Sequence, residues 1–385
     1  MRDEFLSFSP PAVGEEEVSE VAEALRSGWI TTGPRTARFE SEFADFVGAE
    51  AALGVSSGTD AMQVALAALG VGRGDVVITT PMTFCSSVHV IEHVGATPVL
   101  VDVEPDTLCI DPEKVASAVS ARAKAILPVH LYGHPCDMGQ LEEIAAEHEL
   151  HIVEDAAHSV PASCGGRSVG SIGDFTAFSF YATKNLTTAE GGMLTGSKIL
   201  VDRARPWALH GMSRDAHDRY QSGGSWYYEV VLPGFKCNMT DLQAALGLRQ
   251  LEKLPAFQAR RREIVARYSA AFSSMPEIEI PVERAGVESA WHLYVIRLNL
   301  DQLSIDRNRF IQELAARHIG TSVHFIPVHV HPYYRDRYGF EPEDFPVTYD
   351  AYQRIISLPL HPRLTDADVD DVTEAVGDVV TRYRR

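Results

Sequence analysis

The stretch AALGVSSGTDAMQVALAALG, residues 51–70, contains the pattern that decides the fold. Ala51–Ser57 is a short apolar run typical of a buried strand, and Asp60–Leu69 has the apolar spacing of a helix that ends at Gly70. The same alternation continues to about residue 196. Strands that alternate with helices predict a mostly parallel sheet with covered faces, and ligands of such sheets bind at the carboxyl ends of the strands.

Elements of both kinds are expected on either side of this stretch. We expect strands over residues 75–80, 97–103, 123–131, 151–156, 293–298 and 321–325, and helices over residues 15–26, 38–47, 87–94, 112–119, 138–149, 240–254, 258–272 and 307–317, with a final helix from Asp366. The helix over 15–26 is amphipathic, with Val18, Val21, Ala22 and Leu25 on one face. Because Pro255 ends a helical pattern, we place a domain boundary there, between a large domain over 1–255 and a smaller α+β domain over 256–385.

Composition and charge exclude several classes of function. Hydrophobic residues make up 45% of the 385 residues and the formal net charge is −19, which argues against nonspecific nucleic-acid binding because few cations are left to neutralise phosphates. The five cysteines are scattered and form no C-x-x-C pair, so we expect a reducing compartment. No apolar run suggests a signal peptide or a membrane span, and we therefore expect a cytoplasmic protein with no membrane partner.

The first candidate site is Ser56-Ser57-Gly58-Thr59-Asp60, where a strand turns into a helix. Helix N-termini carry unpaired N–H groups, so the small residues Gly58 and Thr59 can wrap a phosphate group. The alternative is a simple helix cap. A second alternative is the nucleophile elbow G-x-S-x-G, which residues 54–58 match; it is disfavoured because a single core strand precedes it and no glycine-rich oxyanion loop is visible.

Two more candidate sites follow apolar strands. Asp155 ends the strand HIVEDA, where it can face a ligand or cap the next turn; beside a pyridine ring it would keep the ring nitrogen protonated. Lys184 follows the aromatic strand FSFY and precedes Glu190-Gly191-Gly192. A lysine is usually a surface residue, but a buried one has the lowered pKa that a Schiff base requires.

These motifs together resemble one family. Asp155-Ala-Ala-His158, Ser179-x-x-x-x-Lys184 and Glu190-Gly-Gly are similar to motifs of the DegT/DnrJ/EryC1/StrS sugar aminotransferases, and the separation of Asp155 from Lys184 also fits. Further similar segments are GWITTGP over 28–34, SGT over 57–59, PVH over 128–130, NMTD over 238–241 and SLPL over 357–360. The resemblance runs nearly end to end, and within the family it is greatest to the UDP-4-amino-4-deoxy-L-arabinose aminotransferase branch.

The resemblance implies a type I aminotransferase fold of the α/β class, a homodimer, and pyridoxal 5′-phosphate as cofactor. It also implies a role for each matching residue. Lys184 would form the Schiff base and move the proton, Asp155 would pair with the ring nitrogen, His158 would lie near the phenolic oxygen, Phe84 would stack on the ring, Gly58, Thr59 and Ser179 would bind the phosphate, and Asn238 would reach the phosphate from the other subunit.

Histidines outside these motifs are weighed separately. His324, His329 and His331 lie in a stretch that resembles the substrate-facing segment of the family, so we expect contacts to a sugar nucleotide there. They could also suggest a metal site, as could the i, i+4 pair His89 and His93, but no acidic or cysteine ligand accompanies either group at motif spacing, and we expect no metal. The polar and aromatic stretch Met212–Tyr228 is expected to be a loop over the site or disordered.

The expected reaction transfers an amino group from an amino acid, glutamate by resemblance, to C4 of a nucleotide-linked keto-sugar. His158, where relatives that act at C3 more often carry Gln, favours C4 over C3. A sugar dehydratase is a close alternative, but such relatives carry His in place of the lysine. A noncatalytic regulator is the last alternative, and it would not need Lys184.

Overall fold

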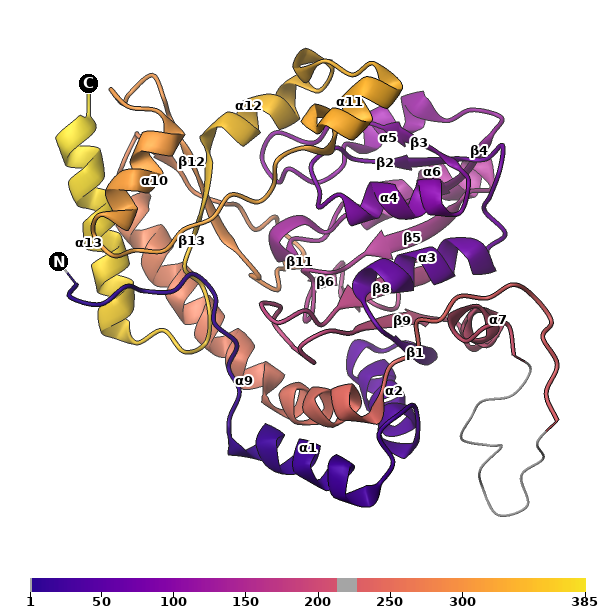
Figure 1. Cartoon of the computed structure of the whole chain (residues 1–385). Coiled ribbons are helices and arrows are strands. Elements are labelled where there is room, and N and C mark those ends of the chain that lie inside the picture. Colours follow the sequence, from indigo (N-terminus) through magenta and orange to yellow (C-terminus); the bar gives the residue numbers. More distant parts are fainter. Residues whose placement is uncertain (1, 213–226) are drawn as a thin grey trace.

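The structure is a computed structural model that describes residues 2–212 and 227–385. Two regions are evident in Figure 1: a large sheet flanked by helices, and a smaller group of helices and strands around both termini. The predicted stretch Met212–Tyr228 falls mostly on residues 213–226, which lie outside the described residues. None of the helices that the structure describes combines the length and apolar composition needed to cross a membrane.

The large sheet has seven strands in the order β1-β9-β8-β5-β4-β2-β3. Neighbouring strands from β8 to β3 pair in parallel, and β9 runs antiparallel to both of its neighbours. The bounds are β1 Ala51–Val55, β2 Val76–Thr79, β3 Thr97–Leu100, β4 Ala123–Ile126, β5 His151–Asp155, β8 Phe175–Ser179 and β9 Gly192–Gly196. The expected α/β fold with a mostly parallel sheet is confirmed.

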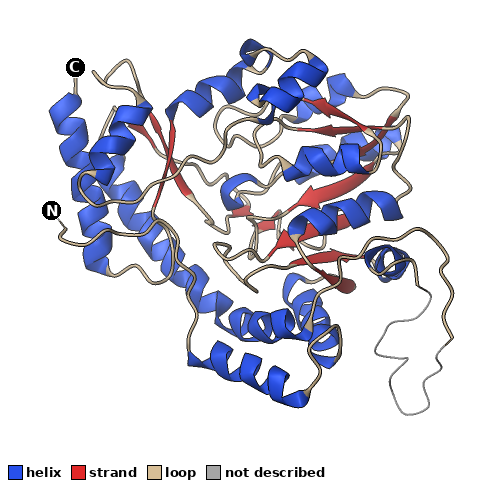
Figure 2. Cartoon of the chain, in the orientation of Figure 1, coloured by secondary structure: helices blue, strands red, loops and turns tan. Residues whose placement is uncertain are grey.

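Helices cover both faces of this sheet (Figure 2). One face packs against α3 Gly58–Ala68, α4 Ser86–His93 and α7 Lys198–Ala208. The other packs against α2 Pro34–Val47, α5 Pro112–Ala118, α6 Met138–His148 and the first half of α9 Asp241–Phe272. Because most strands are buried on both faces, they read as nearly continuous apolar runs, which is the pattern that predicted them.

Helix α9 corrects the expectation of two helices separated at Pro255. It is continuous for 32 residues, with Thr240 as its N-cap and Pro255 inside it. A proline removes one backbone N–H and costs helix stability, but here each half of the helix is buried in a core of its own. Leu248 and Leu254 pack beside the large sheet, whereas Tyr268 and Phe272 belong to the C-terminal core. Tertiary packing therefore overrides the local helix breaker.

The C-terminal region is built on a three-stranded antiparallel sheet, β10 Ile278–Glu279, β12 Tyr294–Leu298 and β13 Ile355–Leu358. The predicted strand over 321–325 is wrong, because only Ser322 forms a bridge, to Ser357, before the chain turns away. Leu6 joins this core from the N-terminus. The remaining elements are α10 Arg307–Ala315, α11 Pro332–Tyr338, α12 Pro346–Arg354, α13 Asp366–Tyr383, short 3-10 turns at Leu131–Gly133, Val328–Val330 and Pro342–Asp344, and a small sheet of β6 Ser163–Cys164, β7 Arg167–Ser168 and β11 Val287–Glu288.

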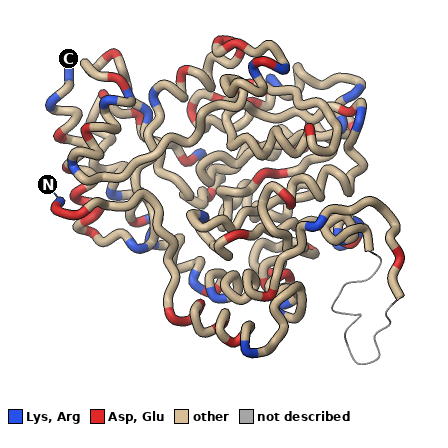
Figure 3. Tube along the Cα trace, in the orientation of Figure 1, with Lys and Arg blue, Asp and Glu red and all other residues tan. Residues whose placement is uncertain are grey.

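Helix α1, Glu15–Ser27, is formed as expected but faces the other way. Its buried side chains are Glu17, Glu20 and Ala24, while Val18 and Leu25 are more than half exposed. The acidic face is buried because α9 presents Arg249, Gln250 and Lys253 to it. Acidic and basic residues accordingly gather where these two helices meet (Figure 3). Val18, Val21, Ala22 and Leu25 instead line an open hollow of about 410 Å³ with Val13 and Leu246.

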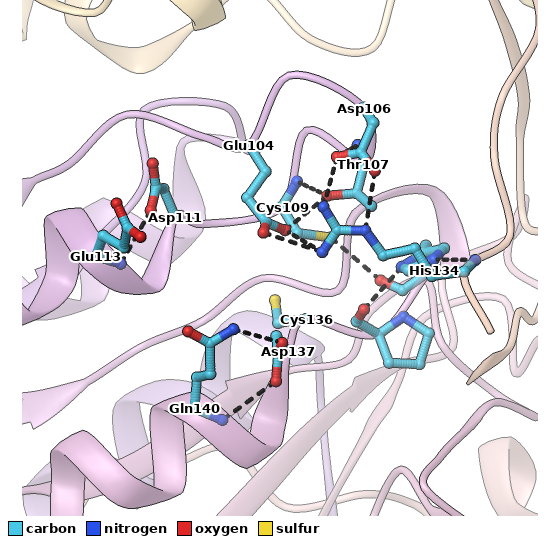
Figure 4. Close-up of polar contacts among 12 residues, drawn as sticks. Glu104, Asp106, Thr107, Cys109, Asp111, Glu113, His134, Cys136, Asp137 and Gln140 are labelled. Atoms are coloured by element: carbon cyan, nitrogen blue, oxygen red, sulfur yellow. Dashed lines mark hydrogen bonds and ion pairs between the residues drawn. The ribbon is translucent and has the colours of Figure 1, made fainter. Parts of the chain in front are cut away.

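A polar cluster fastens the segment after β3 to the chain beyond α9. Arg284 donates from Nη1 to Glu104 at 2.8 Å and from Nη2 to Asp106 at 2.6 Å, and its backbone N–H donates to Nε2 of His134 at 3.2 Å. Figure 4 shows Glu104, Asp106 and Cys109 gathered near His134. These contacts tie the two halves of the chain together.

Candidate active site

A cavity of about 510 Å³ opens at the carboxyl ends of the central strands. It is bordered by the end of β5, the end of β8 and the beginning of α3, which is where open α/β sheets bind ligands. The wall holds these predicted site residues: Gly58, Thr59, Phe84, Asp155, His158, Ser179, Lys184 and His324. Residues from five separate parts of the sequence therefore meet around one space.

The first turn of α3 forms one end of the cavity. Ser57 is the N-cap and accepts a hydrogen bond from the Asp60 N–H at 3.0 Å. A Cβ added to Gly58 would lie 2.9 Å from Cβ of Ser179, so glycine lets the helix begin against the end of β8. Because first-turn N–H groups have no partner within the helix, those of Gly58 and Thr59 can bind an anion.

The serines of this turn do not have the geometry of a nucleophile elbow. The hydroxyls of Ser56 and Ser57 both donate to one carboxylate oxygen of Asp60, at 2.5 and 2.8 Å. A nucleophilic serine needs a general base within hydrogen-bond reach, usually a histidine. Here both hydroxyls serve the helix cap, and the hydrolase alternative finds no support.

Asp155, the last residue of β5, also lines the cavity. One oxygen of its carboxylate accepts from the Ser87 hydroxyl at 2.7 Å, and the other accepts from the Ala157 N–H at 3.0 Å. The side chain is buried, yet it lines the cavity. Asp155 thus caps the following turn and also faces a ligand space. The two donors fix its orientation and stabilise its negative charge.

Lys184 lies in the loop between β8 and β9, on the cavity wall. Its backbone N–H donates to the Tyr181 carbonyl at 2.9 Å, which closes a turn before the lysine. Burial lowers the pKa of Lys184 to about 8, although the charge of Asp155 opposes that shift. Within the described part of the chain, Lys184 takes part in no ion pair at contact distance. A lysine of this kind has a reactive neutral amine near neutral pH.

Two histidines on the wall are kept neutral. Burial, then the charge of Lys184, holds the pKa of His158 well below its ordinary value. The same two causes lower the pKa of His324 to about 4. Nδ1 of His158 accepts the Tyr132 N–H at 3.2 Å, so its hydrogen must lie on Nε2. His158 therefore offers a fixed hydrogen-bond donor.

Three other residues were not predicted from the sequence. Ser87, the partner of Asp155, follows the carboxyl end of β2, and its place after a strand could have been noticed. His292 and Phe325 line the cavity from the C-terminal region; Phe325 lies beside His324 in the segment that resembles the substrate-facing one, whereas no motif marks His292. The ring of Phe325 lies 5.9 Å from that of Phe84, which is 57% exposed at the rim.

Three predicted residues lie elsewhere. Asn238 is next to β1, with its amide donating to Thr32 Oγ1 at 2.6 Å, and is not part of the cavity wall of its own chain. His329 is fully buried against Phe345, with Nε2 facing the Pro342 carbonyl at 3.3 Å. His331 precedes α11, also off the wall. Of the three predicted substrate histidines, the structure brings only His324 to the cavity.

The residues on the wall fit pyridoxal 5′-phosphate. The first turn of α3 and Ser179 suit its phosphate, the fixed carboxylate of Asp155 suits its ring nitrogen, and Lys184 suits its aldehyde. The donor on His158 suits the phenolic oxygen. Each group of the cofactor thus finds a partner of matching chemistry.

Comparisons with known proteins agree with this geometry. Residues 11–377 match the model of the DegT/DnrJ/EryC1/StrS aminotransferase family. The chain is 51% identical to the spore coat polysaccharide biosynthesis protein SpsC of Bacillus subtilis, over 98% of each chain. The PLP form of the putative sugar aminotransferase Spr1654 of Streptococcus pneumoniae superposes with a TM-score of 0.92 at 37% identity, covering 98% of this chain and 99% of the other. PseC of Helicobacter pylori, an aminotransferase of pseudoaminic acid biosynthesis, gives 0.90 at 26% identity, covering 99% and 100%.

Proposed function

The chain belongs to the DegT/DnrJ/EryC1/StrS aminotransferase family, and from that premise we propose that it transfers an amino group from glutamate to C4 of a nucleotide-linked keto-sugar. The observation that carries the proposal is the single cavity in which Lys184, Asp155 and the first turn of α3 meet. An amine, a fixed carboxylate and an anion cradle are the parts that a PLP-dependent transaminase needs.

Pyridoxal 5′-phosphate is the cofactor, and when bound it supplies an electron sink for carbanion chemistry. The residues of the chain supply the rest. Asp155, oriented by Ser87 and the Ala157 N–H, keeps the ring nitrogen protonated because its negative charge favours the charged form. Its donors keep it from turning away during turnover.

Lys184 has two tasks in this proposal. Its amine, with a pKa lowered to about 8 by burial, binds the cofactor at rest. When it is not bound to the cofactor, the same amine would be placed to hold and pass a proton at the reacting carbon.

The proposed C4 position rests on the family resemblance at His158, where relatives that act at C3 more often carry Gln. His324, held by the Ser357 hydroxyl at 2.8 Å, is the proposed sugar contact. The expectation of the UDP-4-amino-4-deoxy-L-arabinose branch gains no support from SpsC or PseC, whose names refer to spore coat polysaccharide and pseudoaminic acid. The proposal therefore stops at the class of nucleotide-linked keto-sugars. A C3 aminotransferase is the alternative, and Lys184 argues against a dehydratase.

The test is a substrate panel. The protein is incubated with glutamate and with nucleotide-linked 4-keto- and 3-keto-sugars, and product mass is followed. We expect amination of 4-keto-sugars, with conversion of glutamate to its keto acid. Amination restricted to 3-keto-sugars would overturn the C4 position, and loss of a sugar hydroxyl without amine incorporation would overturn the transaminase.

We also propose a homodimer with shared active sites, in the cytoplasm. Phe84 and Tyr181 are about half exposed at the cavity, and the apolar hollow on α1 has room for a partner side chain. Asn238, off the wall of its own cavity, is the proposed phosphate contact in the other subunit. The five cysteines are free thiols, which suits a reducing compartment.

Mixing two inactive variants tests the shared site. If Asn238 acts across the interface, dimers formed from Lys184→Ala and Asn238→Asp subunits contain one site with both native residues, and mixing restores up to about a quarter of the activity. If Asn238 acts within its own chain, both sites of the mixed dimer are defective and mixing restores nothing. Sedimentation first establishes the oligomeric state.

A further inference from the structure

The residue after the reactive lysine joins three segments of the chain. The Asn185 side chain is buried, and its Nδ2 donates to the carbonyl of Val160 at 3.1 Å and to that of Ala290 at 2.9 Å. Its Oδ1 lies 3.1 Å from Nδ1 of His292. One side chain thus links the lysine loop, the turn after β5 and the segment leading to β12.

These contacts leave one orientation for the amide. An Asn Nδ2 has two hydrogens, and here each faces a carbonyl oxygen. A flipped amide would place its oxygen against both carbonyls, which is repulsive and leaves buried acceptors without donors. Oδ1 of Asn185 can therefore only accept, and its partner must be a donor.

The orientation of Asn185 also determines the protonation of His292. Because Oδ1 accepts, Nδ1 of His292 carries the hydrogen. Burial is the largest cause that lowers the pKa of His292 well below its ordinary value, and the charge of Lys184 acts in the same direction, so the ring is neutral. Nε2 of His292 is then unprotonated and can accept a hydrogen bond, and the residue lines the cavity.

The neighbouring ring has the complementary form. His158 carries its hydrogen on Nε2, since the Tyr132 N–H occupies Nδ1. The ring centroids of His158 and His292 are 4.4 Å apart. Two neutral imidazoles, each fixed by a partner outside the cavity, thus lie in contact beside Lys184. A substitution at His292 would therefore remove a contact of Asn185, which holds the lysine loop, and would also remove the ring that packs against His158.

We propose that Asn185 and His292 are positioning residues for Lys184: the Asn185 amide fixes the lysine loop against Val160 and Ala290, and His292, held as the Nδ1–H form, completes the buried wall beside His158. This proposal rests on the function proposed above for Lys184. Two quantities test it: the affinity for the cofactor, and the pH at which Lys184 is half deprotonated, which we call its midpoint pH. The proposal can therefore fail while the transaminase assignment stands.

A matched pair of substitutions tests the Nδ1–H donor. The amide nitrogen of Asn can take the place of imidazole Nδ1, whereas that of Gln takes the place of Nε2. We expect His292→Asn to keep affinity for pyridoxal 5′-phosphate within about threefold of the parent, and His292→Gln to lose about tenfold, as for one buried hydrogen bond. With the loop loosened and water admitted, the midpoint pH for Lys184 should rise in the Gln variant only.

A control variant separates positioning from general destabilisation. Asp102 is a buried clamp of the same kind, accepting from Thr348 N–H and Oγ1 at 2.9 and 2.7 Å, but it is not on the cavity wall. Asp102→Asn should lower the unfolding temperature and leave the midpoint pH unchanged. The proposal would be overturned if His292→Asn and His292→Gln had the same affinity for the cofactor and the same midpoint pH of Lys184.

A measurement on the native protein needs no variant. With ¹⁵N-labelled histidine, nuclear magnetic resonance distinguishes a protonated from an unprotonated ring nitrogen. We expect His292 to show a hydrogen on Nδ1 and His158 to show one on Nε2. A hydrogen on Nε2 of His292 would mean that the Asn185 amide is oriented the other way, and the proposal would be wrong.

Discussion

Two lysines in two regions of the molecule, Lys184 on the cavity wall and Lys253 on α9, show what makes one of them reactive. Desolvation is the largest effect on both, and it lowers the pKa. At Lys253, hydrogen bonds from its ammonium to Glu17 at 2.7 Å and Glu16 at 2.9 Å outweigh desolvation and raise the pKa. At Lys184 the charge of Asp155 opposes desolvation without overcoming it. Whether a lysine pKa is raised or lowered therefore depends on carboxylates in direct contact with the ammonium, and not on burial alone.

The largest effect is expected from removing the reactive amine. Lys184→Ala should abolish the absorbance of the lysine–cofactor linkage and lower transamination by at least about a thousandfold, since covalent binding and proton transfer both disappear. Lys253→Met is the matched control and should leave activity per folded molecule within about twofold. If Lys184→Ala turned over substrate as fast as the parent protein, Lys184 would be no more important for activity than Lys253. The role assigned to Lys184 would then be wrong.

The next effect sharpens the role of the opposing carboxylate. Asp155→Asn keeps the size of the side chain but removes its charge, so the ring nitrogen is no longer held protonated. We expect kcat to fall about a hundredfold, as for the loss of one electrostatic partner in a closed site. The Ser87→Ala substitution removes one hydrogen-bond donor to Asp155, and it should lower kcat by much less. An unaffected kcat in Asp155→Asn would contradict the assigned pairing.

A pH titration compares the two lysines directly. Since burial lowers the pKa of Lys184 to about 8, its neutral amine increases about fivefold from pH 7 to pH 8 and then levels off. The rate at which the cofactor-free protein binds pyridoxal 5′-phosphate covalently should follow that curve. Labelling of Lys253 by an amine reagent should follow a curve whose midpoint lies above the ordinary lysine pKa, because its carboxylate partners raise the pKa. A midpoint near 10.5 for Lys184 would show that the site is not desolvated.

The smallest effect is on stability, at the α1–α9 contact. Glu17 is buried and accepts from Gly14 N–H, Gln250 and Lys253. Desolvation raises its pKa, but these bonds lower it more. Its stabilising contribution is present above the ordinary glutamate pKa and is lost as the pH falls through the lowered value. Glu17→Gln should cost about 1–3 kcal/mol at neutral pH, measured by denaturant unfolding, with the activity of folded protein unchanged. The cost should shrink in acid, and a constant cost would contradict the charged pairing.

Much of the site could be predicted because its residues follow strand ends. Gly58, Asp155 and Ser179 each come at a change from an apolar strand to a polar turn, and parallel strands bring such ends to one edge of the sheet. His292 could not be predicted in this way. It reaches the cavity after β11 pairs with β6 and so brings the chain back beside the segment that follows β5, and no local pattern records that contact.

The sequence by itself determined the alternation of strands and helices, because that depends on local periodicity, and its motifs carried the resemblance to the family and marked Lys184 and Asp155 as candidate site residues. Tertiary structure decided which face of α1 is buried, the passage of α9 through Pro255, and the protonation of His292. Each of these depends on partners distant in sequence: the cations of α9 outweigh the apolar face of α1, two cores keep one helix continuous through a proline, and one amide fixes a hydrogen on a ring. Local propensity is worth tenths of a kcal/mol per residue, whereas each buried partner is worth about 1 kcal/mol or more, so packing decides such cases.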